Sequence, residues 1–388
     1  MRFSARTSQK DAPNRLSEAV VRCTPRFDLT TSNPTTAGIP YDTVAILGAL
    51  ARTEAMTYAP LPFGLASARD AVAADLRARG LSAASARIAL TASTSEAYAA
   101  LFKVLCDPGD EILVPVPSYP LLDFLAAFDS VTLKRYPLVY AGGWHVDLDA
   151  LRAAIGPRTK AIVVVSPNNP TGSYLSRFEL DAMLDTGLPI VSDEVFATYP
   201  FASDAPPAGR IASVLGAERG LVFSLSGLSK LAALPQLKLG WIAAAGDDAL
   251  VTAALARLEL VLDAYLSVAA PVQHALPTLL ASRATAEGAI RARTRTNLAA
   301  LRSALAASPT SATLLDVEAG WYAILRVPET RTDEEWSLRL VEEDSVHVQP
   351  GYFFDMDRGA HLVVSLLTPE AIFAEGISRL VKRIAEDT

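Results

Sequence analysis

Lys230 is the residue of this chain whose setting is best suited to covalent chemistry. It lies in the stretch 224–241, SLSGLSKLAALPQLKLGW, just beyond an apolar run that predicts a strand. A lysine buried among Ser, Gly and Leu would have a lowered pKa, as an amine that forms imines requires. A second cation, Lys238, follows eight residues later. A surface lysine in a loop is the competing interpretation.

Two further polar side chains follow apolar runs in the same way. The stretch 161–172, AIVVVSPNNPTG, places Asn169 after a predicted strand, and 188–196, LPIVSDEVF, does the same for Asp193. Open α/β sheets bind ligands at the carboxyl ends of their strands, so both side chains are candidates to hold a ligand. Ordinary turn formation at Asn169 and a helix cap at Asp193 remain open as alternatives.

Hydroxyl residues open a predicted helix at 94–106. Ser93, Thr94 and Ser95 lie in TASTSEA (91–97), where side-chain and backbone donors would point along the positive end of the helix dipole. This arrangement suits a phosphate group. It suits a simple helix N-cap equally well.

These candidates must be positioned by alternating strands and helices. Short apolar runs predict buried strands at 111–116, 161–166, 188–192, 220–224 and 240–245. Helical periodicity predicts helices at 66–78, 94–106, 147–155, 178–185 and 247–265, the last long enough to pass from one domain to another. The alternation is typical of an α/β fold with a mostly parallel sheet flanked by helices.

The pattern changes near residue 276, which predicts a smaller α+β domain. Strands are expected around 320–327, 345–348 and 361–367, and a closing helix at 370–385. The predicted division is an N-terminal arm with part of the small domain, a large domain and a small C-terminal domain: 1–45, 46–275 and 276–388.

Composition narrows the class of protein. The chain has 388 residues, is 51% hydrophobic, and carries 35 Lys and Arg against 42 Asp and Glu, a net charge of −7. This balance argues against nucleic acid or an anionic membrane as the main partner. Two cysteines, Cys23 and Cys106, exclude a disulfide framework, and four histidines show no metal-binding spacing. The polar N-terminal residues 1–14 argue against a secretory signal, so a cytoplasmic protein is expected.

Taken together, the motifs resemble those of the fold-type I pyridoxal phosphate enzymes, specifically the class I/II aminotransferase family. The resemblance begins near Asp28 and runs to the C-terminus. Its markers, whose order and spacing are specific in combination, are DLTTSNP (28–34), YAPLPFG (58–64), DPGDEILVPVPSYP (107–120), SPNNPTG (166–172), SDEVF (192–196) and GLSK…LPQLKLGW (227–241).

The resemblance implies a role for each matched residue. Lys230 would form the internal aldimine with pyridoxal phosphate and then shuttle a proton during a ping-pong transfer from an amino donor to a carbonyl acceptor. Asp193 would pair with the pyridine N–H, Asn169 would donate to the phenolic oxygen, and Tyr119 would stack on the ring. The residues expected at the phosphate are Ser93, Thr94, Ser95 and Lys238.

The same resemblance implies a homodimer and a substrate contact. Tyr58, in YAPLPFG, would reach the phosphate of the neighbouring subunit, so that two chains share their sites. Ser32, in DLTTSNP, is expected beside the substrate.

Three departures from the family concern the cofactor. Lys238 replaces an arginine, and ammonium lacks the bidentate grip of guanidinium. Phe196 replaces a tyrosine that donates to the phenolic oxygen, and the sequence leaves open whether Tyr199 substitutes for it. Gly227 replaces a serine, whose contact Ser226 or Ser229 would then provide.

A fourth departure concerns the substrate. The family has arginine two residues before the serine of the strand at 361–368, HLVVSLLT, and this chain has Val363 there. The carboxylate clamp is therefore missing, provided that this strand is correctly aligned. Another cation would bind the carboxylate, with Arg15, Arg22 and Arg26 as candidates, or the donor is an amine or carries its acid elsewhere.

Two other functions compete with aminotransfer. A pyridoxal phosphate lyase or decarboxylase would use the same cofactor and lysine. A non-catalytic ligand-sensing module is the third hypothesis. It is disfavoured because residues 1–27 are too few for a DNA-binding domain and because Lys230, Asp193 and Asn169 are all present.

Overall fold

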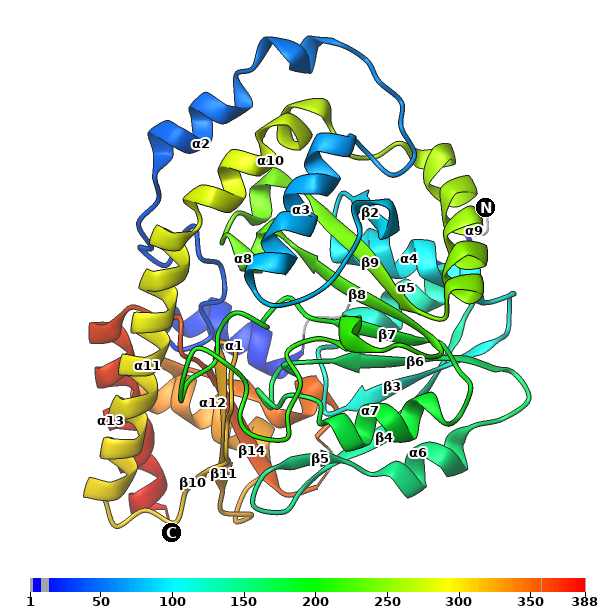
Figure 1. Cartoon of the computed structure of the whole chain (residues 1–388). Helices are drawn as coiled ribbons and strands as arrows, with labels where there is room; N and C mark the ends of the chain where they lie inside the picture. The colour runs from blue at the N-terminus through cyan, green and yellow to red at the C-terminus, as the bar shows by residue number, and fades with distance from the viewer. Residues whose placement is uncertain (1–2, 8–13, 357, 388) are drawn as a thin grey trace.

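An eight-stranded sheet forms the centre of the molecule (Figure 1). The computed structural model describes residues 3–7, 14–356 and 358–387, so part of the expected N-terminal arm lies outside the described residues. The strands run parallel from β4 through β3, β6 and β7 to β8, and β2, β9 and β5 are antiparallel to their neighbours. In spatial order they are β2 (Ile88–Thr91), β9 (Gly240–Gly246), β8 (Leu221–Gly227), β7 (Ile190–Asp193), β6 (Thr159–Val165), β3 (Glu111–Val116), β4 (Thr132–Tyr140) and β5 (Trp144–Val146).

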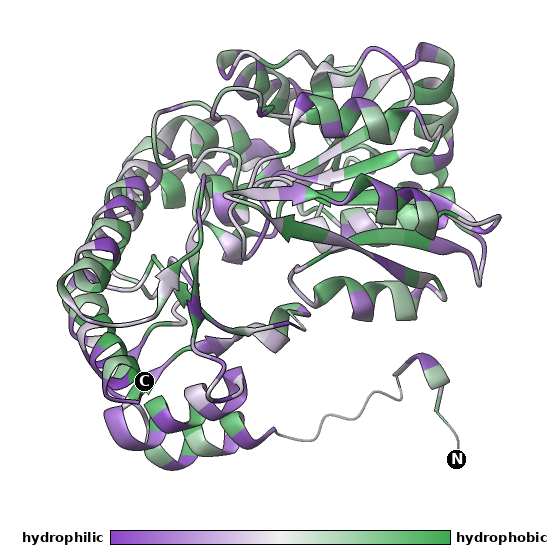
Figure 2. Cartoon of the chain, turned by 90° about the horizontal axis from the view of Figure 1, so that it is seen from below, coloured by the Kyte–Doolittle hydropathy of each residue, from purple (hydrophilic) through white to green (hydrophobic). Residues whose placement is uncertain are grey.

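Helices cover both faces of this sheet. The apolar cluster on one face includes side chains of α3 (Ala66–Ala78), α6 (Leu148–Ala154), α7 (Arg177–Leu184) and α10 (Ala270–Ser282). The cluster on the other face includes α4 (Thr94–Leu105), α5 (Leu121–Phe128) and α9 (Asp248–Tyr265). The central strands are buried on both faces, and this explains their continuous apolar runs. Several strands accordingly appear green in Figure 2, whereas the helices mix green and purple.

A second, smaller α+β unit contains a four-stranded antiparallel sheet in the order β10-β11-β14-β13. A separate parallel pair joins β1 to β12. The strands are β1 (Phe27–Asp28), β10 (Thr313–Leu314), β11 (Tyr322–Val327), β12 (Val346–His347), β13 (Gln349–Pro350) and β14 (Ala360–Ser365). Its helices are α1 (Arg15–Cys23), α11 (Ala284–Ala307), α12 (Asp333–Asp344) and α13 (Glu370–Glu386).

Shorter elements complete the chain. Two are the α-helices α2 (Thr43–Leu50) and α8 (Leu228–Leu231). The six 3-10 turns are η1 (Ala5–Thr7), η2 (Thr53–Met56), η3 (Ser85–Arg87), η4 (Val214–Gly216), η5 (Pro235–Leu237) and η6 (Gly351–Phe354).

The fold confirms the α/β class. It corrects one expectation, which concerns the helix that connects the large domain to the small one. Helix α9 was expected to pass between domains, but its buried residues Val251, Leu258 and Leu262 pack against the large sheet. The long connecting helix is α11, drawn in yellow in Figure 1, and the small-domain cluster takes Leu298 and Leu301 from it. Length alone did not distinguish the two helices. The domain boundaries at 45 and 275 remain a prediction.

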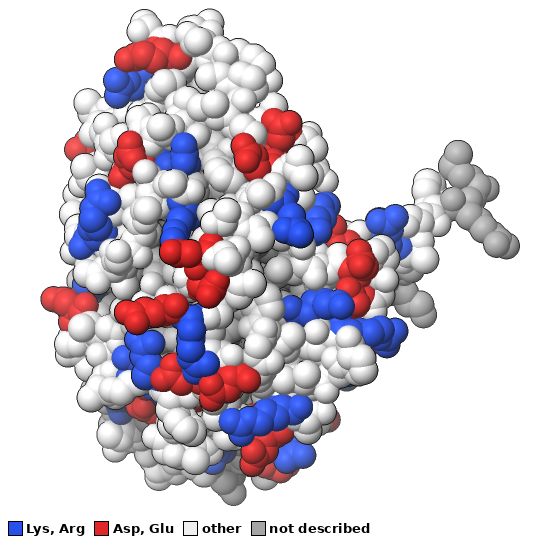
Figure 3. Space-filling model, turned by 45° about the vertical axis from the view of Figure 1, so that its right-hand side comes forward, with Lys and Arg blue, Asp and Glu red and all other residues white. Residues whose placement is uncertain are grey.

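The surface carries both signs of charge. On the face shown in Figure 3, the Lys and Arg groups are interspersed with Asp and Glu. No helix among the described residues is both long and apolar enough to cross a membrane.

Candidate active site

Three neighbouring parallel strands bring Asn169, Asp193 and Lys230 to one edge of the large sheet. Asp193 is the last residue of β7, while Asn169 and Lys230 lie shortly after the ends of β6 and β8. This is the carboxyl edge, where open α/β sheets form their ligand sites. The three side chains line one cavity of about 290 Å³.

Lys230 extends from the short helix α8 into a partly aromatic environment. Its Nζ lies 5.2 Å from the ring centroid of Trp321 and 6.0 Å from that of Phe196. Burial lowers the pKa of the Lys230 amine, and the negative charge of Asp193 opposes this shift. A larger fraction of neutral amine makes Lys230 a better nucleophile than an exposed lysine.

The Tyr199 hydroxyl is engaged by the protein backbone. The Tyr199 hydroxyl donates a 2.6 Å hydrogen bond to the backbone carbonyl of Lys230, and its ring is buried against Trp321. Tyr199 therefore orients the turn that carries Lys230 through a contact with its backbone. This contact argues against Tyr199 as the substitute for the hydroxyl that Phe196 lacks.

The carboxylate of Asp193 is held on both oxygens. Its Oδ1 accepts from the Val195 amide at 3.2 Å, and its Oδ2 accepts from the Tyr98 hydroxyl at 3.3 Å. Burial raises the pKa of Asp193 to about 6. The neighbouring Glu194 accepts from Ser224 at 2.6 Å and is fully engaged elsewhere. Asp193 is thus the member of the pair available to a ligand in the cavity.

The first turn of α4 adjoins the ends of β8 and β9. A Cβ on Gly240 would lie 3.3 Å from the Thr94 amide nitrogen, and one on Gly227 would lie 2.8 Å from Gly240 Cα. The absence of side chains at both glycines permits this close approach. It also gives a physical reason for Gly227, since a serine there would clash with β9.

The predicted site residues divide into two groups. Those that line the cavity are Ser32, Thr94, Tyr119, Asn169, Asp193, Phe196, Ser229 and Lys230. Those that do not line it are Tyr58, Ser93, Ser95, Ser226, Lys238 and Val363. The Ser93 side chain accepts from the Glu96 amide as the N-cap of α4, and Lys238 is exposed two residues before Gly240.

The residues present fit pyridoxal phosphate. The side-chain oxygen of Asn169 is buried and has no hydrogen-bond partner, although the residue lines the cavity. A carboxylate, an amine of lowered pKa and the donors at the start of α4 surround the same space. Such a donor set suits a ligand that combines an aldehyde, a basic ring nitrogen and a phosphate.

The opposite wall comes from the small domain and carries no charge. Tyr322, Gln349 and Phe354 line it together with Ser32. The contributions of Gln349 and Phe354 could not be predicted from sequence. Gln349 belongs to β13, and Phe354 belongs to the turn η6 that follows it.

Val363 is buried behind this wall. It is 0% exposed and belongs to the same apolar cluster as Phe196, Tyr322 and Phe354. In the sheet it pairs with Ile324 on one side and Gln349 on the other. The cavity wall at the expected clamp position is therefore neutral.

The arginines proposed as replacements are engaged elsewhere. Arg15 pairs with Glu334 at 3.4 Å, Arg22 pairs with Glu342, and Arg26 stacks on Phe27. None lines the Lys230 cavity, and among the described residues that do, there is no arginine.

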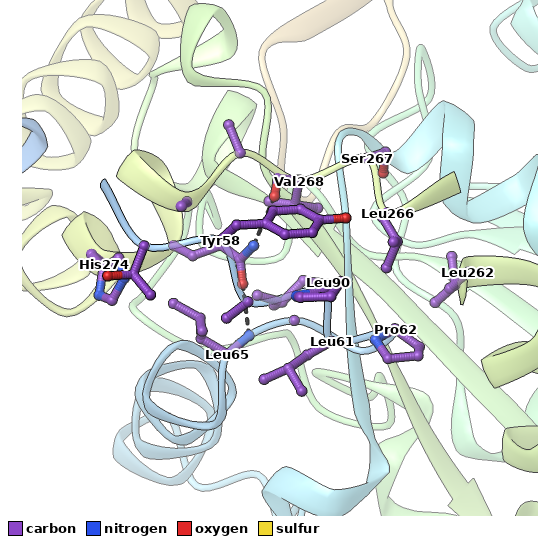
Figure 4. A pocket seen from close by; sticks show the side chains of 17 residues that line it. Tyr58, Leu61, Pro62, Leu65, Leu90, Leu262, Leu266, Ser267, Val268 and His274 are labelled. Atoms are coloured by element: carbon purple, nitrogen blue, oxygen red, sulfur yellow. Dashed lines mark hydrogen bonds between the residues drawn. The ribbon is translucent and has the colours of Figure 1, made fainter. Parts of the chain in front are cut away.

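Tyr58 lies at a separate pocket. It is 80% exposed, and the pocket beside it is lined by apolar residues that include Leu61, Leu90, Leu262 and Val268. In the view of Figure 4 the Tyr58 ring lies between Val268 and Leu90, and Leu262 lies to one side. Within one chain, Tyr58 is therefore not part of the Lys230 cavity.

Tyr98 is the functional candidate that the sequence motifs did not single out. The signal was present, because Tyr98 follows Thr94 by four residues in a predicted helix and so shares its face. The histidines show no comparable convergence. No group of three metal-binding side chains occurs in the described part of the chain.

Comparisons with known proteins agree with this geometry. The chain is 30% identical over 231 residues to nicotianamine aminotransferase 1 of Oryza sativa subsp. japonica, covering 57% of this chain and 45% of that protein. It is 32% identical over 204 residues to S-alkyl-thiohydroximate lyase SUR1 of Arabidopsis thaliana, covering 50% and 42%. The chain thus spans less than half the length of these two relatives.

The fold matches over the full length. The structure of alanine aminotransferase from Pyrococcus furiosus superposes with a TM-score of 0.86 at 23% identity, covering 99% of this chain and 100% of that one. The family model described as aminotransferase class I and II matches residues 27–376. This chain belongs to the class I and II aminotransferase family.

Proposed function

We propose that the protein is a pyridoxal phosphate-dependent aminotransferase that moves an amino group from a donor to a 2-oxo acid or other carbonyl acceptor. The observation that carries this proposal is the convergence of Lys230, Asp193 and Asn169 on one cavity at the carboxyl edge of the sheet. Pyridoxal phosphate, when bound, supplies the electron sink that stabilises negative charge on the substrate carbon.

The chain's own residues bind and orient the reactants. The Lys230 amine would hold the cofactor through its aldehyde group, and the same amine would be the base that moves a proton at the substrate carbon. The Asp193 carboxylate holds the ring nitrogen, the Asn169 side chain holds the ring oxygen, and Tyr119 packs on the ring face. The proposed phosphate ligands that line the cavity are Thr94 and Ser229. Four further residues do not line it in the single chain and are proposed only because the sequence resemblance places them at the phosphate: Ser93, Ser95, Ser226 and Lys238.

The small-domain wall of the cavity favours an amino donor whose α-carboxylate is absent or bound weakly. Ser32 and Gln349 offer neutral hydrogen bonds, and Val363 leaves an apolar surface behind Tyr322. A desolvated carboxylate without a cationic partner is costly. Amines and amino acids with large apolar side chains are therefore the proposed donors, and aspartate and glutamate are disfavoured.

A homodimer with shared sites is proposed on the basis of exposed apolar surface. Val44, Leu47, Met56 and Tyr58 are all strongly exposed in the single chain, around the segment that contains α2. Large apolar side chains exposed along one segment are typical of an interface. Sedimentation equilibrium, expected to give twice the 41.2 kDa of one chain, tests the assembly. A cytoplasmic location is proposed from the two free cysteines.

The decisive experiment is a half-reaction. An amino donor added without acceptor should convert the bound cofactor stoichiometrically to its amine form, with loss of the visible absorbance. A lyase or decarboxylase, the second candidate favoured by the match to SUR1, would retain the aldehyde form and release its product continuously. A ligand-sensing module would bind without turnover.

A further inference from the structure

One helix contributes to both ends of the candidate cofactor site. Thr94, at the start of α4, and Tyr98, one turn later, both line the cavity. Residues four apart lie on the same face of a helix. The position of α4 therefore determines both the phosphate end of the cavity and the end where Asp193 lies.

The Tyr98 hydroxyl has an evident partner. The side chain is 3% exposed, and its hydroxyl donates to Asp193 Oδ2 at 3.3 Å. The ring packs at 6.0 Å from Phe102, a contact that a phenylalanine would make equally well. The hydroxyl thus adds one feature that core packing does not require, a hydrogen bond to the carboxylate.

We propose that Tyr98 is a positioning residue, whose hydroxyl holds the Asp193 carboxylate in place as the acceptor for the protonated ring nitrogen of the cofactor. This inference rests on the proposed function of the cavity. A second acceptor site on Asp193 is occupied by the Val195 amide, so both oxygens are oriented before any ligand binds.

The charges and hydrogen bonds around Asp193 predict the direction in which its pKa should change when the Tyr98 hydroxyl is removed. Burial of the carboxylate and the charge of Glu194 raise the pKa of Asp193, while the Tyr98 and Val195 hydrogen bonds and the charge of Lys230 lower it. From the side of β4, Tyr136 is the titratable group that faces Tyr98. Loss of the Tyr98 hydroxyl should therefore raise the pKa of Asp193 above its present value of about 6.

The test is the pH dependence of pyridoxal phosphate binding to the cofactor-free protein. In the wild type, affinity should fall as the pH drops through about 6, because Asp193 becomes neutral. In Tyr98→Phe, that midpoint should move upward by about one pH unit, the effect of one hydrogen bond to a charged group. Affinity should then fall about fivefold at pH 6 and about twofold at pH 7, while affinity near pH 9 should match the wild type.

Two controls separate this role from a general loss of packing. Tyr174→Phe removes another buried hydroxyl, which donates to the carbonyl of Ala197, and should leave the profile unchanged. Asp193→Asn should remove the fall in pyridoxal phosphate affinity at low pH. Adding Tyr98→Phe to Asp193→Asn should not change the pH profile further. A Tyr98→Phe profile that overlays the wild type, or an equal effect in the Asp193→Asn background, would overturn the proposal.

The outcome is distinguishable from failure of the proposed function. Binding of pyridoxal phosphate by the wild type, with a bond to Lys230 that borohydride traps, tests that function. Wild-type protein that binds no pyridoxal phosphate would overturn both. Normal wild-type binding with an unshifted Tyr98→Phe profile would overturn the role of Tyr98 alone.

Discussion

The two walls of the Lys230 cavity differ in chemistry. The large-domain wall carries an amine, a buried carboxylate and an amide, contributed by Lys230, Asp193 and Asn169. The small-domain wall carries the neutral side chains of Gln349, Tyr322 and Phe354. The first wall contains the residues that the sequence motifs predicted, whereas Val363 stands behind the second, where a cation was expected.

This difference separates the chemistry of the cofactor from the choice of substrate. Parallel strands of one sheet fix the first wall, so its groups are placed by backbone hydrogen bonds and a continuous apolar core. The second wall depends on side chains of the smaller unit, from β11, β13 and the turn η6. Substitutions there change recognition and leave the covalent machinery in place.

The largest effect is expected from a substitution in the large-domain wall. Lys230→Ala should abolish the borohydride-trapped bond to the cofactor and reduce turnover by a factor on the order of 10⁴ or more. The fold should persist, because Lys230 lies at the edge of the cavity. Mass spectrometry of the peptide that contains residue 230 measures attachment.

Lys238→Ala is the matched control for that experiment. It should weaken pyridoxal phosphate binding but leave the trapped bond on Lys230. A trapped bond in the Lys230→Ala variant, carried by Lys238, would show that the nucleophile has been misassigned.

An intermediate effect is expected at the second wall. Phenylalanine and 2-phenylethylamine differ only in the α-carboxylate, and the wild type should show a kcat/KM for the amine at least equal to that for the amino acid. Aspartate and glutamate should be poor donors. Wild-type turnover of glutamate with a KM in the usual range of roughly 1 μM to 1 mM would contradict this prediction.

The small-domain wall can be altered at Gln349. This residue lines the cavity and is paired with Val363 in the neighbouring strand. Gln349→Arg should raise kcat/KM for phenylalanine relative to 2-phenylethylamine by roughly tenfold, because a charge-assisted pair then binds the carboxylate. Gln349→Met, of similar length and neutral, should not produce this change. An equal effect of both substitutions would mean that length alone is responsible.

The sequence predicted much of the architecture because buried parallel strands are continuous apolar runs. The expected strand at 111–116 coincides with β3, and the helix at 66–78 coincides with α3. Strand β4 was missed because Lys134 and Arg135 interrupt its apolar pattern at the flank of the sheet. Antiparallel β9 was recognised as a strand, but its direction is set by pairing that sequence does not encode locally.

The large-domain wall was predicted better than the small-domain wall for a related reason. Asp193 ends β7 and Asn169 lies four residues after the end of β6, so the pairing of these neighbouring strands brings them together. Gln349 and Phe354 reach the cavity only through packing between domains, which no local pattern reports. The same packing buries Val363, so an arginine restored at that position would enter an apolar cluster.

The smallest expected effect concerns the missing hydroxyl at Phe196, on the boundary between the two walls. Phe196 lines the cavity, and its ring meets Trp321 edge-on at 5.3 Å. Phe196→Tyr should place a donor near the ring oxygen of the cofactor and stabilise its ionised form. The pH midpoint of the visible absorbance of cofactor-loaded protein should therefore fall, measured by spectrophotometric titration.

Tyr199→Phe distinguishes this explanation from the alternative that Tyr199 already supplies the donor. The Tyr199 hydroxyl donates to the Lys230 carbonyl, so its removal should leave the absorbance midpoint unchanged. A rise of the midpoint in Tyr199→Phe would identify Tyr199 as the donor. An unchanged midpoint in Phe196→Tyr would mean that another group, such as Asn169, already saturates the ring oxygen.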